Sequence, residues 1–250
     1  MTHPFATRQI PFFLTAAAPC PYLPGQWERK VFTRIEIGEG PALNDALTHA
    51  GFRRSQGVLY RPACEACDAC KSVRIDVARF GWKRRWRKIL RRNDDLTVST
   101  EAQTATMEQY DLLTRYLDSR HGDGDMAGMS FGEYVMMAEE GAQRTHIAEY
   151  RDRSGTLVAA ALTDVLKDGL SLIYSYFDPA QERRSTGAFI ILDAVRQAEA
   201  AGLPFVYLGY WVRGSRKMSY KAAYQPLQVL TPSGWQAYGE LDNDEGGDED

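Results

Sequence analysis

The fold is decided by residues 145–177, THIAEYRDRSGTLVAAALTDVLKDGLSLIYSYF. This stretch contains three apolar runs, Thr145–Tyr150, Thr156–Leu166 and Leu170–Phe177. Short polar segments that contain glycine separate the runs. Apolar runs bounded by turn residues in this way predict three consecutive β-strands joined by tight turns.

The residues that follow predict one helix and a further strand. Thr186–Ala201 has apolar residues at helical spacing, and Gly202 directly after it is a typical helix terminator. Phe205–Leu208 then predicts a strand. The order β-β-β-α-β indicates a mixed sheet with helices packed against it. This order is similar to that of acyltransferase domains of the GNAT type. The predicted fold class is therefore α+β, with a GNAT-like mixed-sheet domain.

The first 80 residues predict a small β-rich module. Its expected elements are strands at Val31–Ile37, Val58–Arg61 and Ser72–Ala78 and a helix at Pro41–Ala50. Residues 82–141 are predicted to be helical, and the two clearest helices are Met107–Arg120 and Phe131–Glu140. The sequence HGDGD at His121–Asp125 predicts a loop between them.

The composition completes this division of the chain. The formal net charge of the 250 residues is −3, but the last eleven residues hold seven of the 33 acidic residues and no basic one. Without them 26 acidic residues face 30 basic ones, so the body of the protein is mildly basic. We expect a cysteine-cluster module (1–80), a basic and helical connecting region (81–141), the GNAT-like domain (142–239) and a disordered acidic tail (240–250).

The apolar segment at the N-terminus has some features of a secretion signal. However, Ile10–Pro19 is short, contains Pro11 and has few charges before it, which is not typical of such a signal. No other stretch approaches the roughly 20 apolar residues of a membrane span. We therefore expect a cytoplasmic protein without a membrane partner.

All four cysteines fit a single site. Cys64, Cys67 and Cys70 form C-x2-C-x2-C, and Cys20 lies upstream. This spacing lets adjacent thiolates converge, and zinc or a [4Fe–4S] cluster needs four such ligands. A set of redox thiols and structurally inert cysteines remain as alternatives, whereas disulfides are disfavoured in the cytosol. The sequence predicts a metal centre at these four cysteines, zinc or [4Fe–4S].

A dense basic segment predicts contact with a phosphate backbone. Residues 83–92 read KRRWRKILRR, and Trp82, Trp86 and Ile89 have the spacing of a buried helix face. The seven charges would then cover the exposed face, which favours nucleic acid over a merely solvated or membrane-surface helix. No recognition motif for duplex DNA is present. The candidate nucleic-acid-binding residues, which do not by themselves decide between RNA and duplex DNA, are Lys83, Arg84, Arg85, Arg87, Lys88, Arg91 and Arg92.

Two C-terminal segments carry a specific family resemblance. They are ALTDVLKDGLSLIYSYFDP at 161–179 and YLGYWVRGSRKMSYKAAYQPLQVL at 207–230. Together with CPYLPG at 20–25, GFRRS at 51–55 and YRPACEACDAC at 60–70, they resemble the arginyl-tRNA–protein transferase family. The resemblance covers nearly the whole chain before the acidic tail.

The short chain and the C-x2-C-x2-C form resemble the bacterial branch of this family, the aspartate/glutamate leucyltransferases. The resemblance implies transfer of leucine from leucyl-tRNA to proteins with N-terminal Asp or Glu, which marks them for degradation. Arginine as the donor amino acid stays open. Many relatives have Cys where this chain has Ser215, so any role of that cysteine is absent here.

The reaction that the resemblance implies is aminolysis of an ester, which requires no enzyme nucleophile. A free α-amine has a pKa of about 7.7–8.0, so positioning and modest proton transfer suffice. Because Arg forks suit carboxylates, Arg213 and Arg216 are candidates for binding the acidic acceptor side chain. The candidate catalytic residues are Asp164, Tyr174, Tyr176, Lys217, Tyr220 and Lys221.

Two other classes of function compete with this one. An acetyl-CoA-dependent N-acyltransferase fits the strand order, but residues 182–188, ERRSTGA, match its pyrophosphate loop only in part. A non-catalytic RNA-binding redox module fits the cysteines and the basic segment. This alternative does not explain the KMSYK motif at 217–221.

Overall fold

A computed structural model describes residues 9–35, 40–101, 104–120, 126, 128–140 and 144–240. The predicted loop His121–Asp125, Ile37 and residues 241–250 of the acidic tail lie outside the described residues.

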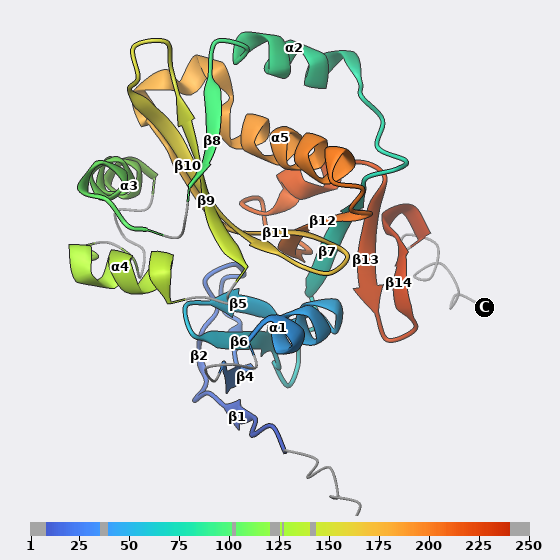
Figure 1. Cartoon of the computed structure of the whole chain (residues 1–250). Coiled ribbons are helices and arrows are strands. Elements are labelled where there is room, and N and C mark those ends of the chain that lie inside the picture. The colour runs from blue at the N-terminus through green and yellow to red at the C-terminus, as the bar shows by residue number, and fades with distance from the viewer. Residues whose placement is uncertain are drawn as a thin grey trace, which may run out of the picture.

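An eight-stranded sheet forms the centre of the molecule, in the order β14-β13-β7-β12-β11-β10-β9-β8 (Figure 1). The only parallel pair between its described strands is β11 with β12. The three predicted consecutive strands and the strand after the helix are confirmed as β9, β10, β11 and β12. The strands are β7 (Cys70–Asp76), β8 (Thr97–Glu101), β9 (Thr145–Arg151), β10 (Leu157–Val165), β11 (Gly169–Phe177), β12 (Phe205–Val212), β13 (Leu227–Thr231) and β14 (Gly234–Ala237).

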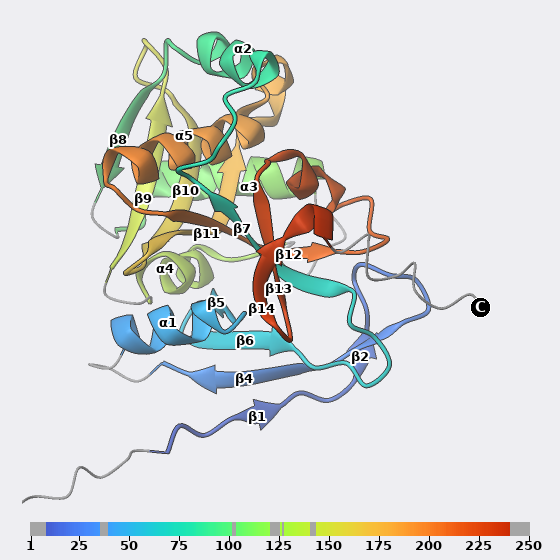
Figure 2. The same ribbon diagram turned by 90° about the vertical axis from the view of Figure 1, so that its right-hand side faces the viewer.

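The predicted β-rich N-terminal module is also present. Its four-stranded antiparallel sheet has the order β1-β4-β6-β5, and a two-stranded ribbon β2-β3 lies beside it. Figure 2 shows this sheet and helix α1 below the large sheet. The elements are β1 (Phe13–Leu14), β2 (Ala18–Pro19), β3 (Trp27–Glu28), β4 (Lys30–Arg34), β5 (Arg53–Ser55), β6 (Val58–Pro62) and α1 (Gly40–His49).

Helices cover both faces of the large sheet (Figure 1). On one face, α5 (Thr186–Ala200) and α2 (Arg84–Arg92) enclose a core that includes Val73, Leu192 and Val206. On the other, α3 (Met107–Arg120) and α4 (Phe131–Glu139) pack on β9 to β11 around Leu113 and Ile147. The apolar spacing of α3 and α5 thus faces the sheet as the sequence predicts. Among the described residues, none of the helices is both long and apolar enough to cross a bilayer.

Two elements differ from the sequence prediction. Residues 97–101 were predicted to be helical, but they form β8 and pair with β9 at the edge of the sheet. Its β-branched residues Thr97, Val98 and Thr100 favour extended backbone, and all three are exposed at this edge. The strand β7 was predicted within the N-terminal module, but it lies between β13 and β12. Side chains of both faces are buried, Val73 and Ile75 on one and Ser72 and Arg74 on the other, as expected for a strand covered on both sides.

Candidate active site

The two parallel strands at the centre of the sheet separate after a short contact. The strands β11 and β12 pair only from Gly169–Ser171 to Phe205–Tyr207, although both continue further. Each strand has an irregular register just beyond this contact, where β11 meets β10 and β12 meets β7. Bulges of this kind are common beside active sites, because they end pairing and redirect side chains.

A side chain from the N-terminal module occupies the gap between these strands. Arg53 of β5 donates from Nη2 to the backbone oxygens of Leu172 and Ile173 of β11, at 2.9 and 3.2 Å. On the β12 side it lies against Gly209, where a Cβ atom would be only 1.5 Å from Arg53 Nη1. Gly209 also has a φ of +74°, a conformation that glycine adopts without strain. Both residues lie within the motifs quoted above, but nothing in the sequence assigned them a role.

Lys221 contacts the backbone of β12 next to this gap. It lies in the short 3-10 helix η2 (Ser219–Ala223), is 7% exposed, and donates from Nζ to the backbone oxygen of Tyr210 at 2.6 Å. Burial, followed by the positive charge of Arg53, lowers the pKa of Lys221 to about 7. A lysine in this state is partly neutral near pH 7 and can accept a proton.

The other predicted residues near Lys221 are exposed. Tyr220 is 50% exposed, and its ring centroid lies 5.8 Å from Lys221 Nζ. Lys217, Arg213 and Arg216 lie on the exposed turn between β12 and η2. Ser215 is buried within that turn, and its backbone oxygen accepts the backbone N–H of Met218.

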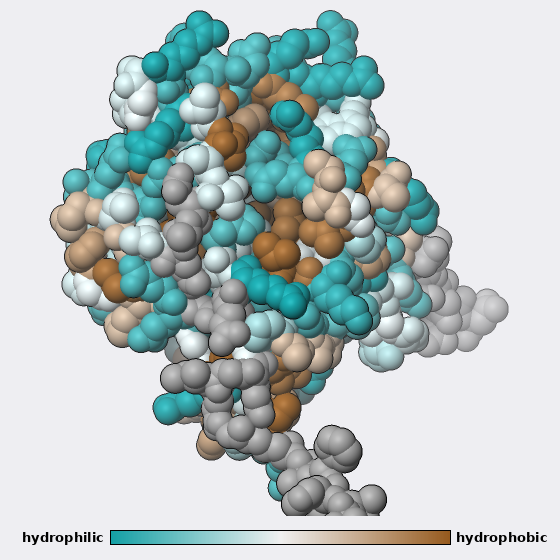
Figure 3. Space-filling model, in the orientation of Figure 1, coloured by the Kyte–Doolittle hydropathy of each residue, from teal (hydrophilic) through white to brown (hydrophobic). Residues whose placement is uncertain are grey.

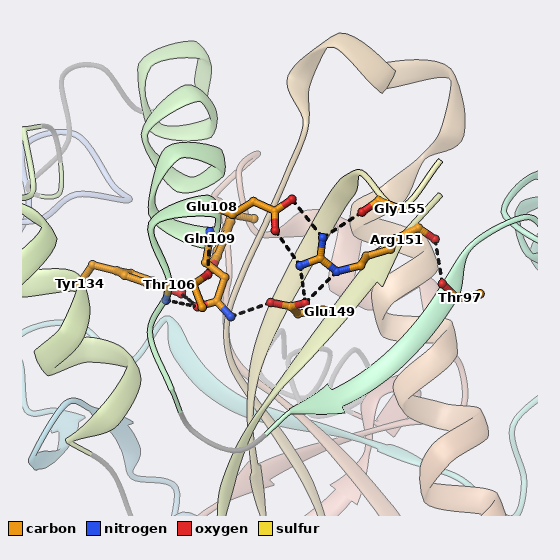
Figure 4. Close-up of polar contacts among 9 residues, drawn as sticks. Thr97, Thr106, Glu108, Gln109, Tyr134, Glu149, Arg151 and Gly155 are labelled. Carbon is orange, nitrogen blue, oxygen red and sulfur yellow. Dashed lines mark hydrogen bonds and ion pairs between the residues drawn. The ribbon is translucent and has the colours of Figure 1, made fainter. Parts of the chain in front are cut away.

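Tyr174 and Tyr176 lie on one face of β11 as predicted, with ring centroids 6.4 Å apart. The hydroxyl of Tyr176 is 2.7 Å from that of Tyr134, and the Tyr176 side chain is almost fully buried. Tyr134 in turn donates to Gln109, which donates to Glu149, and Glu149 accepts from Arg151 (Figure 4). This network favours a structural role for Tyr176. Tyr174 is half-buried, and burial raises its pKa.

Asp164 forms a buried ion pair with Arg54. Its Oδ2 accepts from Arg54 Nε at 2.7 Å and from Asn44 at 2.9 Å. Its Oδ1 accepts from Arg54 Nη2 at 2.8 Å and from Thr145 at 2.6 Å. The side chains of both charged residues are at most 1% exposed. Both carboxylate oxygens are therefore engaged, and the contacts favour Asp164 as the residue that joins the N-terminal module to β10.

The basic segment forms helix α2 with its predicted apolar face inward. Trp86 is buried and stacks on Tyr224 at 4.8 Å with an interplanar angle of 6°. Arg85 donates to the backbone oxygen of Ala223, and Arg92 to that of Arg183. All seven basic side chains are exposed, and Figure 3 shows hydrophilic residues over this end of the molecule. Within the described chain, five of them have no hydrogen-bond or ion-pair partner: Lys83, Arg84, Arg87, Lys88 and Arg91.

The four cysteines line one cavity of about 650 Å³ between the N-terminal module and the end of β13. Burial, together with the neighbouring Cys20, Cys64 and Cys67, raises the pKa of Cys70 to about 12. The thiol of Cys64 lies 3.8 Å from the backbone oxygen of Arg29. As the described side chains stand, no three His, Cys, Asp or Glu residues are arranged to hold a metal ion. The donor set itself suits a thiolate-bound centre.

Comparisons with known proteins decide the family. The family model described as arginine-tRNA-protein transferase, C terminus, matches residues 108–231, and the corresponding N-terminus model matches residues 18–88. An aspartate/glutamate leucyltransferase from Maricaulis maris (strain MCS10) is 86% identical over 241 residues, which cover 96% of this chain and 95% of that protein. The chain belongs to the aspartate/glutamate leucyltransferases. It is therefore an aminoacyltransferase.

A second member of the family, from Phenylobacterium zucineum (strain HLK1), is 56% identical over 240 residues, covering 94% of this chain and 93% of that protein. Among solved structures, the C-terminal domain of a putative lysylphosphatidylglycerol synthetase from Agrobacterium fabrum overlaps with a TM-score of 0.43 at 19% identity. That overlap covers 69% of this chain and 52% of the synthetase domain.

Proposed function

We propose that this protein transfers leucine from leucyl-tRNA to the α-amine of proteins that begin with Asp or Glu, which marks those proteins for degradation. The names of the relatives support the donor and the acceptor. Because charged tRNA is found in the cytoplasm, the proposed reaction is cytoplasmic.

The contact between α2 and η2 is the observation that carries this proposal. Trp86 of the basic helix stacks on Tyr224, and Arg85 donates to Ala223 at the end of the segment that holds Lys221. The helix that would bind the tRNA backbone therefore packs directly against the segment that would act on the aminoacyl ester of that tRNA. An acetyl-CoA-dependent enzyme has no need of this arrangement.

The chemistry requires one bond to form and one to break. The neutral α-amine attacks the carbonyl carbon of the aminoacyl ester, the C–N bond forms, and the C–O bond to the tRNA ribose breaks. The amine proton must reach the departing ribose oxygen. We assign this relay to Lys221, which accepts the proton in its neutral form and returns it to the ribose oxygen. Tyr174, Tyr220 and Lys217 remain proposed positioning groups around this relay.

A matrix of donors and acceptors tests the function. The protein is purified without oxygen and mixed with labelled leucyl-tRNA or arginyl-tRNA and peptides that begin with Asp, Glu, Lys or Ala. We expect label from leucyl-tRNA only, on the Asp and Glu peptides only. Transfer of arginine instead would move the protein to the other branch of the family. Absence of transfer from both donors would overturn the enzyme proposal.

Neutralising α2 should weaken tRNA binding in a salt-dependent way. In a variant with Arg87→Ala, Lys88→Ala and Arg91→Ala, the slope of log Kd against log salt concentration should fall by about 1 for each phosphate that the helix no longer neutralises. The reason is that fewer counterions are released from the tRNA on binding. Filter binding of uncharged tRNA at several salt concentrations measures the slope.

The matched control is Lys167→Ala, which removes an exposed cation at the turn between β10 and β11. It should leave the slope unchanged. An unchanged slope in the triple variant would show that tRNA does not contact α2.

We propose further that the four cysteines hold a metal centre, zinc or a [4Fe–4S] cluster. Cys20, Cys64, Cys67 and Cys70 line one cavity, and their side chains would have to turn toward one another on loading. Such a centre would join the N-terminal segment to the loop before β7 and so contribute to folding. Tyr210 also lines this cavity, while its backbone oxygen accepts from Lys221.

Elemental analysis and the absorption spectrum of protein purified without oxygen test this centre. We expect bound zinc, or iron with sulfide, in the wild-type protein and its loss in Cys64→Ser with Cys67→Ser. The thermal midpoint should fall together with the metal content. Glu65→Gln, in the same loop, should retain the metal. A folded wild-type protein free of both zinc and iron would rule the centre out.

A further inference from the structure

Arg53 has a donor group without a partner in the gap between β11 and β12. Nη2 is held by the backbone oxygens of Leu172 and Ile173, whereas Nη1 is buried and has no hydrogen-bond partner among the described residues. A guanidinium carries five N–H donors, and a buried donor left unpaired destabilises the folded state. Nη1 therefore lacks an acceptor within the described part of the chain, although the Arg53 residue as a whole is only partly buried, and an acceptor from outside the chain would satisfy it.

The charge of this region indicates what that acceptor is. Neither Arg53 nor Lys221 forms an ion pair within the part of the chain that the structure describes, although the adjacent Arg54 is paired with Asp164. These two neighbouring side chains are thus both basic, and the charge of Arg53 disfavours the protonated form of Lys221. A buried cation is stabilised by an anion, and Arg is the side chain best shaped for a carboxylate.

We infer that Arg53 binds the side-chain carboxylate of the N-terminal Asp or Glu of the acceptor protein. This inference rests on the proposed leucyl transfer. One acceptor residue carries a partner for each of these two side chains, since its carboxylate would face Arg53 while its α-amine faces Lys221. A tRNA phosphate is the less favoured partner for Arg53, because α2 already offers five free cations to the phosphate backbone among the described residues.

The same arrangement couples recognition to reactivity. The positive charge of Arg53 lowers the pKa of Lys221, and a bound carboxylate offsets that charge. An acidic acceptor would therefore make Lys221 a stronger base at the moment of reaction. An acceptor with Asn or Gln at its N-terminus supplies no such charge.

The test measures acceptor discrimination in Arg53→Gln. With leucyl-tRNA as donor, kcat/KM is determined for two peptides that differ only in Asp or Asn at the first position. The wild-type ratio should fall by about 10- to 100-fold in Arg53→Gln, the value of a hydrogen bond to a charged group. The loss should be larger for the Asp peptide, whereas any change in the pKa of Lys221 affects both peptides and cancels in the ratio. Arg34→Gln, which changes an exposed arginine of β4, should keep the ratio.

Gly209→Ala provides a second variant that keeps the charge. The added Cβ would overlap Arg53 Nη1 and displace the guanidinium, so the ratio should fall here too. An unchanged ratio in both variants, or an equal loss for both peptides, would overturn the inference. If the ratio fell in Arg216→Gln but not in Arg53→Gln or Gly209→Ala, the carboxylate would bind at the exposed turn. That result would also overturn the inference. Lack of transfer by the wild-type protein to either peptide would instead contradict the proposed function.

Discussion

Replacing Lys221 by methionine is expected to lower kcat/KM for leucyl transfer by about 100-fold or more, the contribution of a positioned acid–base group. Methionine fills a similar volume, so the buried site should keep its packing. Circular dichroism and tRNA binding should remain as in the wild-type protein. Lys167→Met, at the exposed turn between β10 and β11, should retain full activity.

The pH dependence separates a proton acceptor from a merely structural lysine. Lys221 has a pKa of about 7, and only its neutral form accepts a proton. The wild-type kcat/KM, which reports the free enzyme, should therefore rise with pH through about 7. The substrate amine, with a pKa of about 7.7–8.0, adds a second rise in every variant. Lys221→Met should retain only that second rise. A wild-type profile identical to that of Lys221→Met would refute the assignment.

Stability supplies a third readout of the same lysine. The pKa of Lys221 is lowered from 10.5 to about 7 on folding, so between these values the unfolded chain binds the extra proton. The stability of the wild-type protein should therefore rise with pH in this window. Relative to Lys221→Met, its free energy of unfolding should increase by about 2 kcal/mol between about pH 7 and about pH 9. Urea denaturation of both proteins at the two pH values measures this difference.

Asp164→Asn should produce the largest loss of stability among these variants. The change leaves Arg54 charged and buried without its partner, which typically costs about 3–5 kcal/mol. Because the carboxylate joins the N-terminal module to β10, the loss should appear in the urea midpoint of the whole protein. The folded fraction should keep a kcat close to that of the wild-type enzyme.

Asp95→Asn is the matched control for this change. Asp95 forms the same two-bond pair with Arg184, at 2.7 and 2.8 Å, but its side chain is 24% exposed. Its loss should cost at most about 1 kcal/mol. A stable Asp164→Asn protein without activity would restore Asp164 as a catalytic residue, as predicted from the sequence.

Local patterns were sufficient for the elements whose spacing is regular. The helices α3 and α5 and the strands β9 to β11 follow from the positions of apolar residues and glycines alone. β8 was missed because TVSTE lies next to a strongly helical segment, and only its pairing with β9 makes it a strand. β7 was predicted as a strand, but its place in the large sheet depends on partners more than 100 residues away.

For the candidate site too, local patterns predicted some residues but not the contacts that these residues make. The KMSYK motif predicted Lys221 as a site residue. The alternation of side chains along a strand predicted that Tyr174 and Tyr176 share one face. The hydrogen bond between Tyr176 and Tyr134 depends on how α4 packs, which no local pattern contains. Likewise, Arg53 and Arg54 are adjacent in GFRRS, but one enters the gap beside Gly209 and the other pairs with Asp164, 110 residues away. Strand alternation predicts that they diverge, but not what each one meets.

The proposed reaction depends on attack of the acceptor α-amine on the leucyl ester. Its most direct test is a single-turnover reaction of the wild-type protein with labelled leucyl-tRNA and one Asp-initiated peptide, offered either with a free or with an acetylated α-amine. We expect rapid labelling of the free peptide, with the new amide located at its N-terminus by fragment-ion mass spectrometry, and no labelling of the acetylated peptide. Equal labelling of both peptides, or of neither, would contradict this reaction.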